Sequence, residues 1–144
     1  MLTLRKDSLE QYLRARFGPG ATLLSYEVIG KASSKGAQKQ YGYGTPVKLT
    51  FRVGGRVQSA VLETMKPGPF GHEHPADRAQ AILWDYDSYG RLPRHVKALD
   101  VGAFTSDQEL MSVASAEEFF VLTQWTEGNS YHLDLERLAK GGRL

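Results

Sequence analysis

The sequence predicts an α+β fold, a five-stranded antiparallel sheet with an N-terminal helix and one lateral helix. Two alternating apolar runs, residues 46–53 and 56–65, flank a Gly54-Gly55 pair and predict a hairpin. A segment of helical periodicity precedes this hairpin and another follows it. Further apolar runs of strand length come later in the chain, which gives the five strands of the predicted antiparallel sheet.

The first predicted helix runs from Asp7 or Ser8 to Phe17. Leu9, Leu13 and Phe17 recur at helical spacing, and Gly18-Pro19-Gly20 ends the periodic pattern. A strand over residues 21–29 follows. The next stretch, residues 30–44, is rich in Gly, Ser and Lys and predicts a loop.

The hairpin is the clearest local prediction. Val47, Leu49 and Phe51 alternate with polar residues, so one face of the strand is apolar. Two glycines between alternating runs favour a tight two-residue turn.

The second half of the chain predicts a lateral helix and two more sheet strands. Pro75 suits the first position of a helix that runs to about Ser88, and Gly90 ends it. The remaining predicted elements are strands over residues 95–104 and 119–125, a turn over 105–108, a short additional strand over 109–113 and a helix over 131–139.

Composition limits the possible functions. The 144 residues fit one domain with 41% hydrophobic and 24% charged residues. A net charge of +2 with scattered basic residues argues against a nucleic-acid partner. The chain has no cysteine, which fits a reducing, cytoplasmic location. The chain contains no apolar run of about 18 residues, so no membrane span is predicted.

Four stretches occur in a suggestive order: residues 59–64 (SAVLET), the helix over 75–88, residues 92–96 (LPRHV) and residues 119–128 (FFVLTQWTEG). Together they resemble the N-terminal lobe of the aminoglycoside phosphotransferase and choline kinase-like family, small-molecule kinases with a protein-kinase-like fold. The resemblance covers roughly residue 21 onward. It implies that residues 21–128 form a nucleotide-binding lobe with a kinase-type lateral helix and 129–144 the start of a linker helix to a second lobe beyond the chain. Residues 1–20 are the N-terminal helix expected from periodicity.

The resemblance implies an ATP-binding small lobe of a phosphotransferase, with Mg²⁺ as a further cofactor and a hydroxylated small molecule as acceptor. The base and metal ligands of such enzymes belong to the other lobe, so the chain alone is expected to be inactive, and no catalytic or metal-binding residue is assigned within it. The implied nucleotide-binding residues are a loop that covers the phosphates (Gly30, Lys31, Ser33, Ser34, Lys35, Gly36), strand positions (Lys48, Val61, Glu63) and a hinge that holds adenine through backbone groups (Gln124, Trp125, Thr126).

The third strand departs from the family pattern at one position. A cation is expected where this chain has Glu63 in Val61-Leu62-Glu63-Thr64. A carboxylate close to a triphosphate is repulsive in a low-dielectric cleft. Lys48 is the best substitute cation, because it lies on the neighbouring strand, and Arg78 is a possible ion-pair partner of Glu63.

Other interpretations stay open. The chain is alternatively a non-catalytic interaction or regulatory module that has lost ATP chemistry, or an unrelated α+β domain. His72 and His74 form an H-x-H pair, but a metal site needs further ligands. His132 and Asp134 imitate a catalytic H-x-D, although the Asn expected five residues after the Asp is Ala139. An isolated lobe exposes apolar surface, so self-association is expected.

Overall fold

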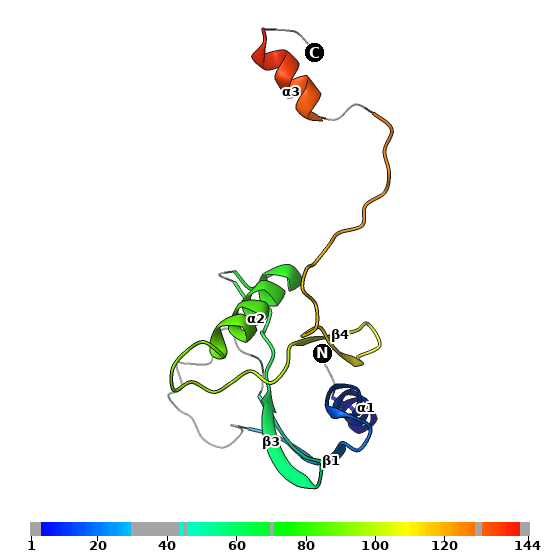
Figure 1. Ribbon diagram of the computed structural model, residues 1–144, viewed down its shortest axis with the longest axis vertical. Coiled ribbons are helices and arrows are strands. Elements are labelled where there is room, and N and C mark those ends of the chain that lie inside the picture. Colours follow the sequence, from blue (N-terminus) through cyan, green and yellow to red (C-terminus); the bar gives the residue numbers. More distant parts are fainter. Residues whose placement is uncertain (1–3, 30–43, 45, 70, 129–130, 142–144) are drawn as a thin grey trace.

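Eight elements follow one another along the described part of the chain (Figure 1). The computed structural model describes residues 4–29, 44, 46–69, 71–128 and 131–141. The elements are α1 (Lys6–Phe17), β1 (Thr22–Val28), β2 (Val47–Val53), β3 (Arg56–Leu62), α2 (Pro75–Tyr89), β4 (Gly102–Phe104), β5 (Leu110–Ser112) and α3 (Tyr131–Ala139). The predicted helices are confirmed to within one or two residues at each end.

The strands form two separate antiparallel sheets, so the predicted five-stranded sheet is wrong. One sheet has the order β1-β2-β3, and the other is the β4-β5 hairpin. Of the strand predicted over residues 95–104, only the last three residues pair. The strand predicted over 119–125 is extended but unpaired, and β5 is formed by the short segment that sequence analysis treated as an addition.

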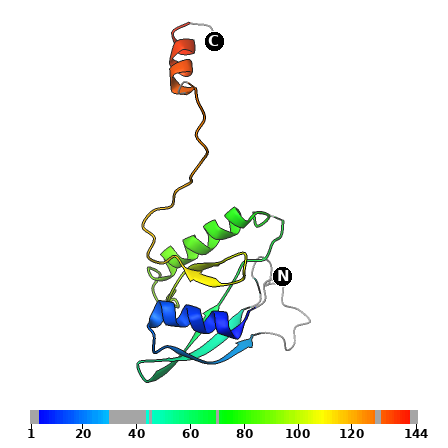
Figure 2. The same ribbon diagram turned by 90° about the vertical axis from the view of Figure 1, so that its right-hand side faces the viewer.

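The physical reason is that a strand exists only where a second strand offers its backbone groups. The aromatic and β-branched residues of segment 119–125 satisfy the side-chain preference of a strand but not this pairing requirement. A hydrogen-bonded turn precedes the segment, in which the amide of Ala116 donates to the carbonyl of Val113 at 3.0 Å. The chain then leaves both sheets (Figures 1 and 2).

The β2-β3 hairpin is formed as predicted. Val53 pairs with Arg56 across the turn. Gly54 and Gly55 have φ values of 55° and 78°, the left-handed conformation that a type I′ turn requires at both central positions. The turn fixes the register of the whole hairpin.

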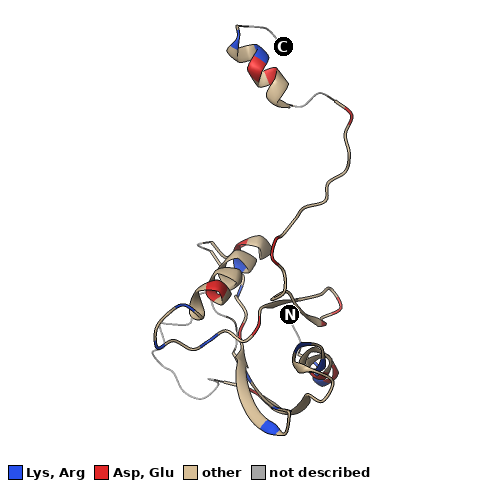
Figure 3. Ribbon diagram, in the orientation of Figure 1, with Lys and Arg blue, Asp and Glu red and all other residues tan. Residues whose placement is uncertain are grey.

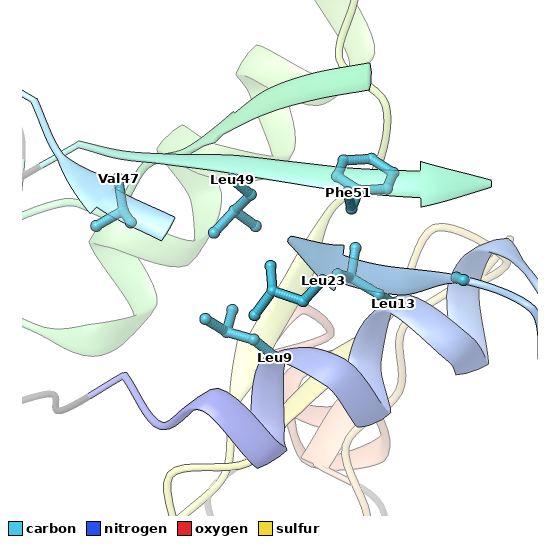
Figure 4. Close-up of a cluster of buried hydrophobic side chains, with 7 residues drawn as sticks. Leu9, Leu13, Leu23, Val47, Leu49 and Phe51 are labelled. Carbon is cyan, nitrogen blue, oxygen red and sulfur yellow. The ribbon is translucent and has the colours of Figure 1, made fainter. Parts of the chain in front are cut away.

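The core lies between α1 and the inner face of the three-stranded sheet. Figure 4 shows Leu9 and Leu13 of α1 directed toward Leu23, Leu49 and Phe51 of the sheet. Leu9, Leu13 and Phe51 are each no more than 1% exposed. This apolar burial is the main stabilising term of the fold.

The β4-β5 hairpin is attached to α1 by polar groups. The hydroxyl of Ser8, itself buried, donates to Oε2 of Glu109 at 2.6 Å, and Arg5 pairs with the other carboxylate oxygen. Figure 2 shows the hairpin between α1 and α2, so that α1 contacts the sheet on one side and the hairpin on the other.

The C-terminal part of the described chain extends away from the two sheets. We call residues 113–128 the connector, and α3 follows it (Figure 1). Neither α2 nor α3 contains a buried residue. Within the described residues, every helix is too short or too polar to cross a lipid bilayer.

Candidate functional site

A groove of about 760 Å³ lies on the inner side of the three-stranded sheet and is the candidate site. This volume falls within the range of about 300–1,000 Å³ that is usual for small-molecule sites. Its residues come from the sheet, both flanking helices, the segment 96–104 and β5. We refer to it as the inner groove.

The inner groove is mainly apolar. Leu49 and Phe51 of β2 lie at its floor beside Ala60 and Leu62 of β3, since these positions alternate toward the core face. One wall is α2, which contributes Ile82, Tyr86 and Tyr89; the opposite wall is α1. The spacing of these α2 residues places them on one helical face.

The charged residues of the inner groove are mostly acidic. Glu63, Asp85 and Asp100 line it, and Lys97 is the one lysine in its lining. Asp100 is already neutralised, because Nε of Arg16 lies 2.9 Å from its Oδ1 atom. Glu63 and Asp85 remain, and no hydrogen bond or ion pair to either side chain is found within the described residues.

Asp100 is the centre of a buried polar network at one end of the inner groove. Its side chain is 5% exposed. It accepts hydrogen bonds from the hydroxyl of Ser112 at 2.8 Å and from the hydroxyl of Tyr12, while Arg16 also donates to the carbonyl of Leu99 at 3.0 Å. Burial, together with the hydrogen bond and negative charge of Asp100, raises the pKa of Tyr12 far above its usual value, against a smaller opposing effect of Arg16.

Sequence reasoning did not identify this network. Its only trace in the sequence is an acid, Asp100, between the apolar residues Leu99 and Val101. The partners come from α1 and β5, about 90 residues before and 12 residues after it. Such long-range partners become neighbours only through the packing of α1 against the hairpin.

The structure places Lys48 away from the inner groove. Val47 and Leu49 on either side of it face the core, so Lys48 points to the opposite face of the sheet. There its Nζ atom lies 3.5 Å from Oε1 of Glu27, a surface ion pair. Val61, which pairs with Lys48 in the register, is 51% exposed. Lys48 therefore does not reach the position predicted for a phosphate-binding cation.

Glu63 lies at the end of the inner groove, directly after β3. The ion pair suggested between Glu63 and Arg78 is not formed. Arg78 instead donates from Nη1 to the carbonyl groups of His72 at 2.8 Å and Glu73 at 3.0 Å. These bonds hold the loop before α2 against the first turn of that helix.

The predicted phosphate-covering loop, Gly30 to Gly36, lies outside the described residues, but the chain on both sides of it is described. The amide of Ile29 donates to the carbonyl of Pro46 at 2.9 Å, and the amide of Gly44 donates to the carbonyl of Thr64. A Cβ atom at Gly44 would lie 2.7 Å from that carbonyl oxygen, so only glycine permits this approach. Both described flanks of the Gly/Ser/Lys tract are therefore hydrogen-bonded, and Gly44 lies beside Thr64, the neighbour of Glu63 in the sequence.

The predicted hinge residues lie in the connector, apart from the inner groove. Gln124, Trp125 and Thr126 are exposed, and the indole nitrogen of Trp125 donates to Glu127 at 2.9 Å. Figure 3 shows the connector as largely uncharged, with acidic residues near both ends. The structure thus brings Val61 and Glu63 into the lining of the inner groove, near the described flanks of the glycine-rich tract, and leaves Lys48 and the hinge elsewhere.

The histidine pair before α2 has a structural role. The backbone amide of His74 donates to the carboxylate of Asp77 at 2.8 Å, which caps the helix N-terminus next to Pro75. No group of three or more potential metal ligands occurs among the described residues.

A scan against protein-family models, a search of curated proteins and a search of solved structures each found no match to this chain. The resemblance drawn from the sequence consequently stays a prediction, and functional inference depends on the residues themselves.

Proposed function

We propose that this chain is the ATP-binding small lobe of a small-molecule phosphotransferase. The observation that carries the proposal is the position of Ile29 and Gly44, the described residues on either side of the glycine- and lysine-rich tract, which are hydrogen-bonded at the Glu63 end of an apolar groove. A nucleotide needs an apolar slot for its base and a mobile set of amides and cations for its phosphates. The sequence of the tract supplies glycines and lysines, and its two described flanks lie at one end of the groove.

The apolar part of the inner groove suits a purine. Ala60 and Leu62 provide a flat strand surface, and Tyr86 and Tyr89 provide aromatic rings on the opposite wall. An uncharged heterocycle would lose little by entering such a slot, since the carboxylate of Asp100 is already paired with Arg16 and hydrogen-bonded to Ser112.

The phosphate-binding part is only partly supplied by the described residues. Lys48 is paired with Glu27, and Glu63 opposes a phosphate group. We therefore assign phosphate neutralisation to Lys31 and Lys35 of the tract. Bound Mg²⁺ would neutralise further phosphate charge, but the described residues offer no ligand set for it. We infer that ATP binding by this chain is weak and that the acceptor hydroxyl compound and its catalytic base belong to a second lobe.

Isothermal titration with ATP and with adenosine tests the proposal. Glu63→Lys removes a repulsive charge and adds an attractive one, so the affinity for ATP should rise by about tenfold or more. Adenosine lacks phosphates, so its affinity should not change. The matched control Glu27→Lys alters an acid on the other face of the sheet, and ATP affinity should stay within about twofold.

Lys31→Ala combined with Lys35→Ala should lower ATP affinity without altering adenosine affinity. If wild-type chain and Glu63→Lys both fail to bind ATP and adenosine at millimolar concentrations, the nucleotide proposal is wrong.

A non-catalytic interaction module is the second candidate. The acidic lining of the inner groove favours it, because Glu63 and Asp85 together outweigh Lys97. On this alternative Glu63→Lys changes no nucleotide affinity, and the free energy of unfolding rises or stays constant because two nearby acids no longer repel each other. The titration of Glu63→Lys with ATP separates the two candidates, and chemical denaturation verifies that the variant is folded.

A further inference from the structure

Residues 119–125, with the sequence FFVLTQW, form the most conspicuous exposed apolar surface of the described chain. Phe120 and Leu122 are each 90% exposed, and Val121 is 84% exposed. The segment is extended, carries no charge, and makes no backbone hydrogen bond to another described element. Such a sequence has high strand propensity, and a strand of this kind in water is a template for pairing with another chain.

A complementary edge exists on β3. This strand pairs only with β2, so its other edge is free among the described elements. Because Val53 and Arg56 close a two-residue turn, hydrogen-bonded pairs alternate from there along the ladder. The backbone groups of Val57, Ser59 and Val61 are consequently directed to the free edge. Ser59 and Val61 also line the inner groove.

We propose that residues 119–125 of one chain add as a strand to the free edge of β3 in a second copy, and that the second copy returns the same contact. This arrangement satisfies the backbone groups of Val57, Ser59 and Val61 and covers the apolar side chains of the connector. It is an isologous exchange with two-fold symmetry.

The occupant is a second copy because of how the connector leaves its own chain. The amide of Val113 donates to the carbonyl of Val101 at 2.8 Å, and the turn closed by Ala116 follows at once. These bonds direct the segment outward, and Figures 1 and 2 both show it running away from the sheet and the hairpin. The segment therefore lies apart from the β3 edge of its own chain, whereas a second copy can receive it as it stands.

The surface involved is large enough for a stable dimer. Three aromatic side chains, Phe119, Phe120 and Trp125, each offer about 150–250 Å². Reciprocal exchange counts them twice, or roughly 900–1,500 Å² before the partner surface is added, which reaches the about 1,200–2,000 Å² of a specific interface. No charge within the segment has to be desolvated.

The inference does not depend on the proposed function, since it uses the backbone edge of β3 and no nucleotide. Its tests are made without nucleotide, so failure of either proposal leaves the other standing.

Sedimentation equilibrium of the full chain is the first test. The expected mass is twice 16.0 kDa. Leu122→Glu places a charge in the centre of the exchanged strand and should weaken dimerisation by at least about tenfold. The matched control Leu92→Glu alters a leucine that is 49% exposed and lies outside the inner groove, and it should dimerise like wild type. A strict monomer, or equal effects of the two variants, would overturn the proposal.

Cysteine cross-linking is the second test, and the absence of native cysteine makes it clean. One chain carries Ser59→Cys and the other carries one cysteine at position 121, 122 or 123. Oxidation of the mixture should give a disulfide-linked heterodimer for at least one of these positions, with circular dichroism verifying that both chains are folded. In a single chain with both cysteines, an intramolecular disulfide in a monomer would show that the segment returns to its own β3 and would overturn the exchange. Cross-linking that is equal for a cysteine at exposed Asp107 would indicate random collision and would also overturn it.

Discussion

The carboxylate of Asp100 is predicted to be a main stabilising link between α1 and the β4-β5 hairpin. Asp100→Asn preserves the size of the side chain but removes its charge and one of its two acceptor oxygens. The native carboxylate forms an ion pair with Arg16, whose Nε atom lies 2.9 Å from Oδ1, and accepts hydrogen bonds from the hydroxyl of Ser112 at 2.8 Å and from the hydroxyl of Tyr12. The substitution therefore affects three contacts at a site that is 5% exposed.

The expected cost is about 2–3 kcal/mol of the free energy of unfolding. Breaking a fully buried ion pair costs about 3–5 kcal/mol, and hydrogen bonds to charged groups contribute about 1.5–3 kcal/mol each. The expected cost lies below the value for a fully buried pair, because the side chain of Arg16 is 35% exposed and can regain some hydration. A loss of this size is large for a domain whose total stability is about 5–15 kcal/mol.

Urea denaturation followed by circular dichroism measures this cost. Asp107→Asn makes the same chemical change at an exposed turn residue and should alter stability by less than about 0.5 kcal/mol. A double-mutant cycle with Tyr12→Phe should show a coupling of about 1 kcal/mol between the two side chains. If Asp100→Asn and Asp107→Asn were equally mild, the network would not be the link that the geometry indicates.

Two further predictions concern α1 and the core. Because the pKa of Tyr12 is higher in the folded than in the unfolded chain, its contribution is fully present below about pH 10. Above that pH the tyrosine ionises in the unfolded chain but not in the folded one. The free energy of unfolding should therefore fall by up to about 1.4 kcal/mol per pH unit, measured by urea denaturation at alkaline pH. If the free energy of unfolding of Tyr12→Phe fell as steeply with pH, Tyr12 would not be the cause. Phe51→Ala should cost about 3–5 kcal/mol, since Phe51 is 1% exposed. Phe120→Ala, at a side chain that is 90% exposed, should cost less than about 0.5 kcal/mol when dilute monomer is measured, and similar losses for both would refute the assigned core.

Sequence reasoning was most successful where neighbours along the chain decide the structure. The boundaries of α2 follow from Pro75 and Gly90, and the β2-β3 hairpin follows from the glycine pair. Proline at a first helical turn and glycines with positive φ are local requirements that only a few residues meet. These parts could be predicted because their physics is contained within about ten residues.

The candidate site was predicted only in part. Glu63 was identified as an unusual residue, and the structure places it in the lining of the inner groove beside the end of the glycine-rich tract. Lys48 is expected from the sequence to be the substitute cation, because it is on the adjacent strand, but strand alternation directs it to the face of the sheet opposite the inner groove. The Asp100 network was not found, since no local pattern announces partners so distant in sequence.

The sequence by itself determined the helices, the hairpin and the apolar face that forms the core, because periodicity and turn chemistry act over a few residues. Only the tertiary structure decided that residues 119–125 stay unpaired and that the strands form two sheets. Pairing depends on which backbone edges come within hydrogen-bonding distance, and that depends on the packing of α1 against both sheets through Phe51 on one side and Glu109 on the other.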